Sequence, residues 1–429
     1  MQINAKLAGV GMVILGLAVA GAYQVGRKQG EGVTSAPATA PAAGHTKGAA
    51  GPAVQRAATT AGDALPSGHP PMAGAGGPAA ETAGKVDVDR SKKFTHFRVG
   101  NKNVKRIYAD GKVIWVGTSG GVIRYDTTTD DFKLFDVRSG LLSNGVFYVG
   151  KLQGRIALGT YGGGLSLLDE KSAKWENYNV PEGLGDAFVY DVLTAGNGDV
   201  WIATWSGANR IRGGALKDRS KWDLYTVENT KKGLPNDWVY GLAEGRNGEI
   251  WMATEGGVAC FKDGTWRNWN HAKGLGAPYD SVKDQIAFKN DPSRHSTHHA
   301  RQKEEMGLQN VDVAYNPNYV VSIAVDRKGV VWAGTWGGGL SRFDGKAWKT
   351  YTVSDGLPGN HVFMLHADGE RLWIGTNNGL ARMEDGKFKV MNVEDGLFAN
   401  TVFSMATSPG SIWVGSYGGV AQIRGAAAN

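Results

Sequence analysis

Cysteine is nearly absent from this chain, which has one, Cys260, in 429 residues. A single cysteine excludes an intrachain disulfide framework and any zinc site built from several thiolates. Charged residues are also sparse, at 20% of the chain, and the net charge of +7 comes from scattered basic residues. No basic run and no helix-turn-helix pattern accompanies that charge, so we expect no binding to nucleic acid.

Glycine and tryptophan are abundant instead, with 64 and 14 residues. A helical protein avoids so much glycine, because each glycine inside a helix costs about 1 kcal/mol relative to alanine. The composition therefore predicts an all-β fold with many turns.

The N-terminus contains the one long apolar run, an uncharged stretch over residues 7–25. It is long enough to cross a bilayer as a helix. The small residues 18–22 also fit the cleavage pattern of a signal peptide. Residues 1–28 are thus either an inner-membrane anchor or a cleaved signal peptide. Both alternatives export the rest of the chain, and we expect a periplasmic location.

Residues 29–88 are dominated by alanine, proline, glycine, threonine and serine, with almost no large apolar side chain. Such a segment cannot bury enough surface to offset the entropy of ordering. We predict a disordered linker here, followed by one folded domain over residues 89–425.

That domain is built from one pattern that occurs seven times: a bulky residue, usually tryptophan, then a small residue two positions later, then threonine or serine. Successive Thr or Ser positions lie 42, 44, 50, 81, 41 and 40 residues apart. Units of this length with about four short strands each predict the blades of a seven-bladed β-propeller. The seven instances span residues 115–118, 157–160, 201–204, 251–254, 332–335, 373–376 and 413–416.

The two ends of the domain predict how the ring closes. The last repeat stops at a third strand, Val420–Arg424, whereas Lys93–Val99 is an outer strand with no repeat before it. We expect this N-terminal outer strand to complete the last blade, which would pair both edges. The repeated tryptophans are expected to pack between blades, with the small residue beside each admitting a ring of the next blade.

The 81-residue spacing predicts an insertion at residues 276–317. A linker of the form Gly-Leu-x-x-Asn-x-Val begins at Gly274, but its asparagine arrives only at Asn318. On a helix His295 and His299 within this insertion would share a face, a spacing able to hold zinc or copper. A lid or docking loop without metal is the alternative.

These motifs resemble the regulator propeller repeat of sensor regions in bacterial two-component systems. Residues 318–344 carry nearly the whole signature, including Asp326–Gly329, Trp332–Thr335 and Arg342–Asp344. The resemblance covers about residues 93–424 and implies a propeller that binds without chemistry. Larger members continue into a kinase, and no autonomous kinase domain is expected here.

Aromatic residues recur where two kinds of loop open on the same face of a propeller, around the mouth of its channel. One kind follows the repeat threonine or serine, and the other lies between the asparagine and valine of the linkers. Such rings suit a small molecule or a protein partner. The alternative is that they only cover the ends of neighbouring blades. The predicted mouth residues are Tyr161, Trp205, Trp336, Tyr417, Trp238, Tyr319 and His361.

The expected function is non-catalytic: binding, sensing or assembly outside the cytoplasm. The alternative is a propeller-type hydrolase or lyase with a metal or a His and Glu acid-base pair in the channel. Inner strands 146–150 and 320–325 carry no carboxylate or histidine, and only His366 and Asp368 are suggestive. No catalytic residue is assigned.

Overall fold

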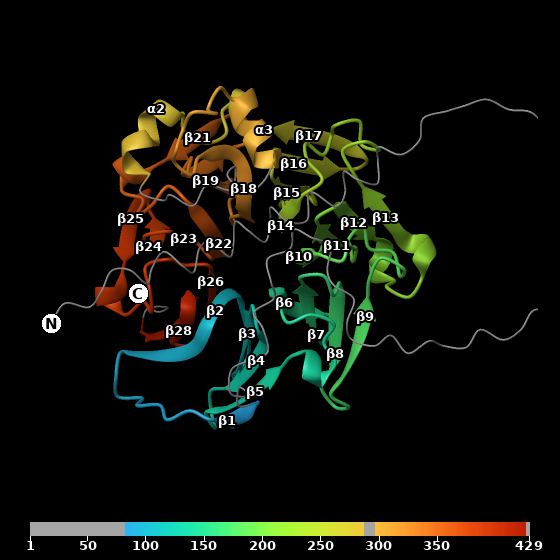
Figure 1. The fold of residues 1–429 in the computed structure, drawn as a ribbon, viewed down its shortest axis with the longest axis vertical. Coiled ribbons are helices and arrows are strands. Elements are labelled where there is room, and N and C mark those ends of the chain that lie inside the picture. The colour runs from blue at the N-terminus through green and yellow to red at the C-terminus, as the bar shows by residue number, and fades with distance from the viewer. Residues whose placement is uncertain (1–81, 287–296, 426–429) are drawn as a thin grey trace, which may run out of the picture. The chain divides into compact units, whose positions relative to one another are not determined.

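The computed structural model describes residues 82–286 and 297–425, which belong to two compact units (Figure 1). Within the smaller unit the described residues form one helix, α3 (Thr297–Glu305). The larger unit holds every described strand. The predicted anchor, residues 1–28, lies outside the described residues, and no helix within them is long and apolar enough to cross a membrane.

Five sheets of the larger unit have four antiparallel strands each, arranged in chain order. The strand nearest the middle of Figure 1 comes first in each of these sheets, and the outer strand comes last. The strands are β6 (Val146–Leu152), β7 (Arg155–Thr160), β8 (Leu165–Asp169) and β9 (Lys174–Tyr178); β10 (Val189–Thr194), β11 (Val200–Thr204), β12 (Gly207–Ile211) and β13 (Trp222–Tyr225); β14 (Val239–Glu244), β15 (Ile250–Thr254), β16 (Gly257–Lys262) and β17 (Thr265–Trp269); β18 (Asn316–Val325), β19 (Val331–Trp336), β20 (Leu340–Phe343) and β21 (Trp348–Tyr351); β22 (Val362–Asp368), β23 (Arg371–Thr376), β24 (Gly379–Glu384) and β25 (Lys387–Met391).

The sixth sheet has eight strands, because the long strand β2 (Phe94–Asp110) belongs to two ladders. Its first half pairs with β28 (Tyr417–Arg424), where Phe94 lies opposite Ile423. Its second half, from Val104 to Asp110, pairs with β3. The predicted pairing of the N-terminal strand with the last repeat is therefore present. The remaining strands of this sheet are β1 (Ala83–Lys85), β3 (Val113–Thr118), β4 (Gly121–Asp126), β5 (Asp131–Phe135), β26 (Ser404–Ser408) and β27 (Ser411–Gly415).

Strand β1 lies inside the segment that the composition predicted to be a disordered linker. It pairs with the outer strand β5, and the Val86 amide donates to the Asp130 carbonyl. Val86 also packs against the apolar cluster formed by residues of the first and last repeats. A free sheet edge explains the difference, since its unpaired backbone groups can order a segment that has no core of its own.

The first strands of the repeats contact one another in a closed series: β2, β6, β10, β14, β18, β22, β26 and again β2. Between each pair of neighbouring repeats lies one apolar cluster, and there are seven such clusters in the larger unit. Six of the clusters centre on a repeat tryptophan that is at most 5% exposed. The predicted packing role of these tryptophans is confirmed. They are Trp115, Trp201, Trp251, Trp332, Trp373 and Trp413.

The small residue of each repeat touches the next inner strand, although not a ring as expected. A Cβ added to Gly334 would lie 2.6 Å from a methyl carbon of Val362, and one added to Gly375 would lie 2.8 Å from Val402. The next repeat thus presents a valine at this point. At Gly334 and Gly375 a larger residue would push the neighbouring sheet away, whereas two other repeats accommodate an alanine, Ala203 and Ala253.

The linkers between sheets share one turn. The Asn360 side chain accepts the Val353 amide at 3.0 Å, seven residues earlier in the chain. Asn318 accepts the His271 amide at 2.6 Å in the same way, but across 47 residues. The linker turn is therefore formed by residues on both sides of the insertion. The short helices are η1 (Val137–Ser139), η2 (Arg212–Gly214), η3 (Arg219–Lys221), η4 (His271–Lys273), α2 (Tyr279–Val282), η5 (Lys283–Gln285), η7 (Val353–Asp355) and η8 (Val393–Asp395).

Candidate binding site

Six of the seven inner strands carry a β-bulge at the same place, one residue after a valine. In β6, for example, the register shifts between Val146 and Tyr148, which leaves Phe147 as the extra residue. Phe403 occupies the same position just before β26. A bulge bends a strand and redirects one side chain out of the ladder, and bulges are frequent beside binding sites.

Each of the seven valines is buried, at most 1% exposed, whereas each residue that follows is half-buried. We call these seven following residues the collar. The collar was not among the predicted site residues, although an aromatic residue after the linker valine in five of the seven repeats was a signal for it. The collar consists of Lys105, Phe147, Tyr190, Tyr240, Val321, Phe363 and Phe403.

The collar rings touch one another across repeats. Ring centroids of Phe147 and Tyr190 are 4.6 Å apart, and those of Tyr190 and Tyr240 are 5.0 Å apart. Phe363 and Phe403 follow at 5.5 Å. The side chains therefore gather from strands that are up to 256 residues apart in the chain.

Predicted mouth residues bridge the collar where it has only Val321. The ring of Tyr319 lies 5.1 Å from that of Tyr240 and stacks on Trp336 at 5.2 Å. Trp336 in turn lies 5.7 Å from Phe363. The aromatic surface is thus continuous from Phe147 to Phe403.

The predicted mouth residues fall into two groups by exposure. Trp205, Trp336, Tyr319 and His361 are buried, whereas Tyr161, Trp238 and Tyr417 are half-buried. Ring contacts join most of them: Trp205 and Trp238 lie 4.8 Å apart, Trp336 and His361 lie 5.3 Å apart, and Tyr161 reaches the collar through Phe147 at 5.8 Å. No ring contact among the described residues joins Tyr417 to the others.

The ends of the insertion explain part of this burial. A ring nitrogen of His361 lies 2.7 Å from the Ala314 carbonyl oxygen. The Tyr315 hydroxyl donates to the Ala277 carbonyl at 2.6 Å and so ties the two ends together. The far end of the insertion therefore lies against His361, and its near end is held to the far end.

Charge at the collar is uneven. Lys105 is its one cationic residue, and its Nζ lies 5.3 Å above the Phe147 ring. Burial lowers the pKa of Lys105 to about 7. On the opposite side the Tyr240 hydroxyl lies 3.5 Å from a carboxylate oxygen of the buried Glu255. Burial, reinforced by Glu255, raises the pKa of Tyr240 well above its ordinary value.

Next along the inner strands, Arg106 forms an ion pair with Asp191 across two repeats. Burial raises the pKa of Asp191, and Arg106 offsets part of this. The Leu242 amide donates to the other Asp191 oxygen at 3.0 Å. Burial also lowers the pKa of His366, and nearby Arg106 adds to that effect. Charged residues of different inner strands therefore do contact one another. The sequence had indicated only His366 and Asp368 as candidates for acid-base residues.

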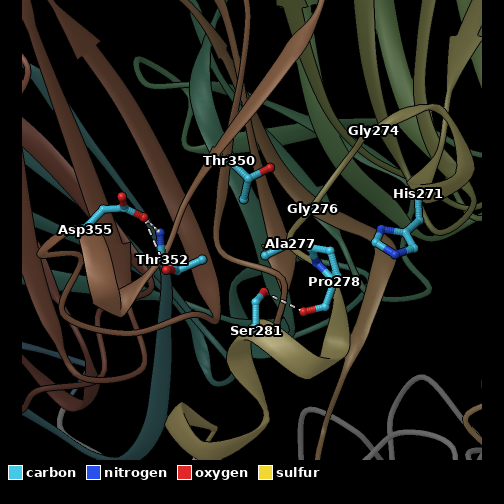
Figure 2. A pocket seen from close by; sticks show the side chains of 9 residues that line it. All are labelled: His271, Gly274, Gly276, Ala277, Pro278, Ser281, Thr350, Thr352 and Asp355. Atoms are coloured by element: carbon cyan, nitrogen blue, oxygen red, sulfur yellow. Dashed lines mark hydrogen bonds between the residues drawn. The ribbon is translucent and has the colours of Figure 1, made fainter.

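A separate pocket of about 500 Å³ lies at the root of the insertion (Figure 2). Its polar groups are occupied by local bonds: the Asp355 carboxylate accepts the Thr352 amide at 2.9 Å, and the Ser281 hydroxyl donates to the Pro278 carbonyl at 2.7 Å. The pocket is lined by His271, Gly274, Gly276, Ala277, Pro278, Ser281, Thr350, Thr352 and Asp355.

The structure does not describe the two histidine side chains of the predicted metal site. His295 lies outside the described residues, as does the side chain of His299. Over residues 82–286 and 297–425, no three His, Cys, Asp or Glu side chains come close enough to hold a metal ion.

Comparison with known proteins identifies the repeat. Residues 233–256 and 314–337 match the family described as two component regulator propeller. No curated protein matches the chain. The resemblance stated from the sequence is thereby confirmed for the propeller repeat.

Solved structures show the same fold. The extracellular domain of a hybrid two component system from B. thetaiotaomicron is 21% identical, with a TM-score of 0.59 over 78% of this chain. The match spans only 41% of that sensor domain. A catalytically inactive virginiamycin B lyase from Staphylococcus aureus, solved with quinupristin, is 12% identical, with a TM-score of 0.54 over 77% of this chain and 99% of its own. At these identities the likeness establishes a β-propeller and no activity.

Proposed function

Since the chain carries regulator propeller repeats, we propose that it is a non-catalytic, extracytoplasmic binding protein that senses or assembles with a partner at the collar. The partner is a small molecule or a protein segment with an aromatic or apolar group. The half-buried mouth residues Tyr161 and Trp238 would extend the contact surface. The collar itself carries the proposal.

Two properties of the collar support this. Its residues are half-buried although each follows a fully buried valine, so the backbone presents them away from the core. Aromatic side chains offer large contact area at low entropic cost and dominate the energetics of many interfaces. A structural role alone would not require aromatic rings at positions where the adjacent valine already fills the core.

We also propose that the larger unit is a propeller of seven blades. The eight-stranded sheet counts as two blades joined through β2, which with the other five sheets makes seven. The seven apolar clusters and the closed series of inner strands support this count. Attachment to the inner membrane through residues 1–28, or secretion after their cleavage, follows from the apolar run.

A hydrolase or lyase remains the second candidate, because Arg106, Asp191 and His366 come from three inner strands. A general base needs a free lone pair toward its substrate. Asp191 has one oxygen on Arg106 and the other on the Leu242 amide, so both of its oxygens already have a partner within the protein. This pairing favours a structural role and a protein without catalysis.

The test is partner capture by the full-length chain from a periplasmic extract, followed by titration of the captured partner. Phe147→Ala combined with Tyr190→Ala should weaken binding about thirtyfold or more, because one aromatic at a desolvated contact carries about 2 kcal/mol. Leu224→Ala is the matched control, since it truncates an exposed apolar residue on an outer strand. Equal affinity of the double variant and the control would place the binding surface elsewhere.

A further inference from the structure

One collar position differs in kind from the other six. Six positions carry aromatic or aliphatic residues, and the seventh carries Lys105. At all seven positions the preceding residue is a buried valine. In β2 the register shift between Val104 and Arg106 places Lys105 where β6 places Phe147.

The charge of Lys105 has no counter-charge in the described part of the chain. No carboxylate there lies within ion-pair distance of its Nζ, and the contact it does make is with the face of the Phe147 ring. Its neighbour Arg106 directs its own charge to Asp191. An aromatic face compensates a cation only in part.

Such a residue has an energetic cost. A half-buried ammonium loses hydration, and the burial that lowers the pKa of Lys105 to about 7 measures that loss. An apolar residue, as at the six equivalent positions, would avoid the cost. An anion brought by a ligand would remove it, and the ring beside the cation would contact the apolar part of the same ligand.

Resting on the proposed function of the collar, we infer that Lys105 is an anion-binding residue and that the collar takes a ligand whose carboxylate adjoins an aromatic or apolar group. Two sources have this chemistry: a free aryl carboxylate, and the C-terminus of a peptide that ends in an aromatic residue. In both the carboxylate accepts from the Lys105 ammonium while the ring packs against Phe147 and its neighbours.

The experiment compares acids with neutral amides on the full-length chain by isothermal titration calorimetry. The small-molecule pair is 3-phenylpropionate and 3-phenylpropanamide, and the peptide pair is Gly-Gly-Phe with a free or an amidated C-terminus. We expect the acid of at least one pair to bind about tenfold more tightly than its amide at pH 6.5. The pair with the larger preference identifies the source.

Three variants isolate the charge. Lys105→Met should abolish the preference for the acid, Lys105→Arg should retain it, and Lys102→Met, which removes a lysine from the same strand, should leave it unchanged. Equal binding of acid and amide to the wild type, or an acid preference that survives in Lys105→Met, would overturn the inference while leaving the collar as a binding surface. No binding of any of the four compounds at millimolar concentration would also overturn it, whereas partner capture would still test the collar independently.

Discussion

Two rings of residues lie at adjacent positions in the inner strands. They differ in exposure and in how much their residue types vary between repeats. The first ring consists of seven valines, identical in sequence and at most 1% exposed. The second is the collar, which varies from lysine to tyrosine and is half-buried. A position that is identical in all repeats serves the packing common to all blades. A position that varies between repeats while its backbone does not is free to serve recognition.

The largest expected effect comes from opening the joint that closes the series of inner strands carrying both rings. Deleting residues 1–99 removes the half of β2 that pairs with β28, and it exposes the backbone edge of β28. We expect this variant to aggregate, because an unpaired strand edge is a template for association. Deleting residues 1–81 leaves every described strand in place and should not alter the melting temperature. Size-exclusion chromatography compares the two, and a monodisperse 1–99 deletion would contradict the proposed closure.

A neighbouring pair of substitutions sharpens the comparison. Val146→Asp buries a carboxylate between two sheets and should destabilise by about 4 kcal/mol or more. Phe147→Asp should change the free energy of unfolding by only about 1 kcal/mol, because it lies at a half-buried site and would give Lys105 a partner. Urea denaturation of both variants measures the difference. Similar losses for the two would mean that the collar belongs to the core.

The third expected effect is a gain of stability. Lys105→Met should stabilise the protein by about 4 kcal/mol at pH 7 and below, since folding lowers the pKa of Lys105 from 10.5 to about 7. The unfolded chain then holds more protons than the folded chain between these values, so wild-type stability rises with pH across them. The advantage of Lys105→Met should shrink over that window and vanish above it. Thermal denaturation from pH 6 to 10.5 checks this, and a constant difference would contradict it.

The features that recur in every repeat could be predicted from the sequence, whereas the collar could not. The tryptophan positions and the pairing of the N-terminal strand follow from spacing, because each is set by contacts that recur. The collar was overlooked because a bulge is a property of pairing between strands, and an alternating pattern does not reveal it. His361 contacts the Ala314 carbonyl and Trp336 lies opposite Asn316, and both Ala314 and Asn316 belong to the far end of a non-repeating segment. Spacing could place His361 and Trp336 in turns but could not state what lies over them.

The pairing of β2 with β28 also sets how the molecule responds to force. Phe94 lies opposite Ile423, and the Arg424 amide donates to the Lys93 carbonyl at 2.8 Å, so the start of β2 and the end of β28 lie at the same end of one ladder. A pull applied between the two termini would load the hydrogen bonds of this ladder singly, like a zipper, and would not shear them together. Once β1 has detached from β5, the ladder of β2 and β28 should therefore open at low tension.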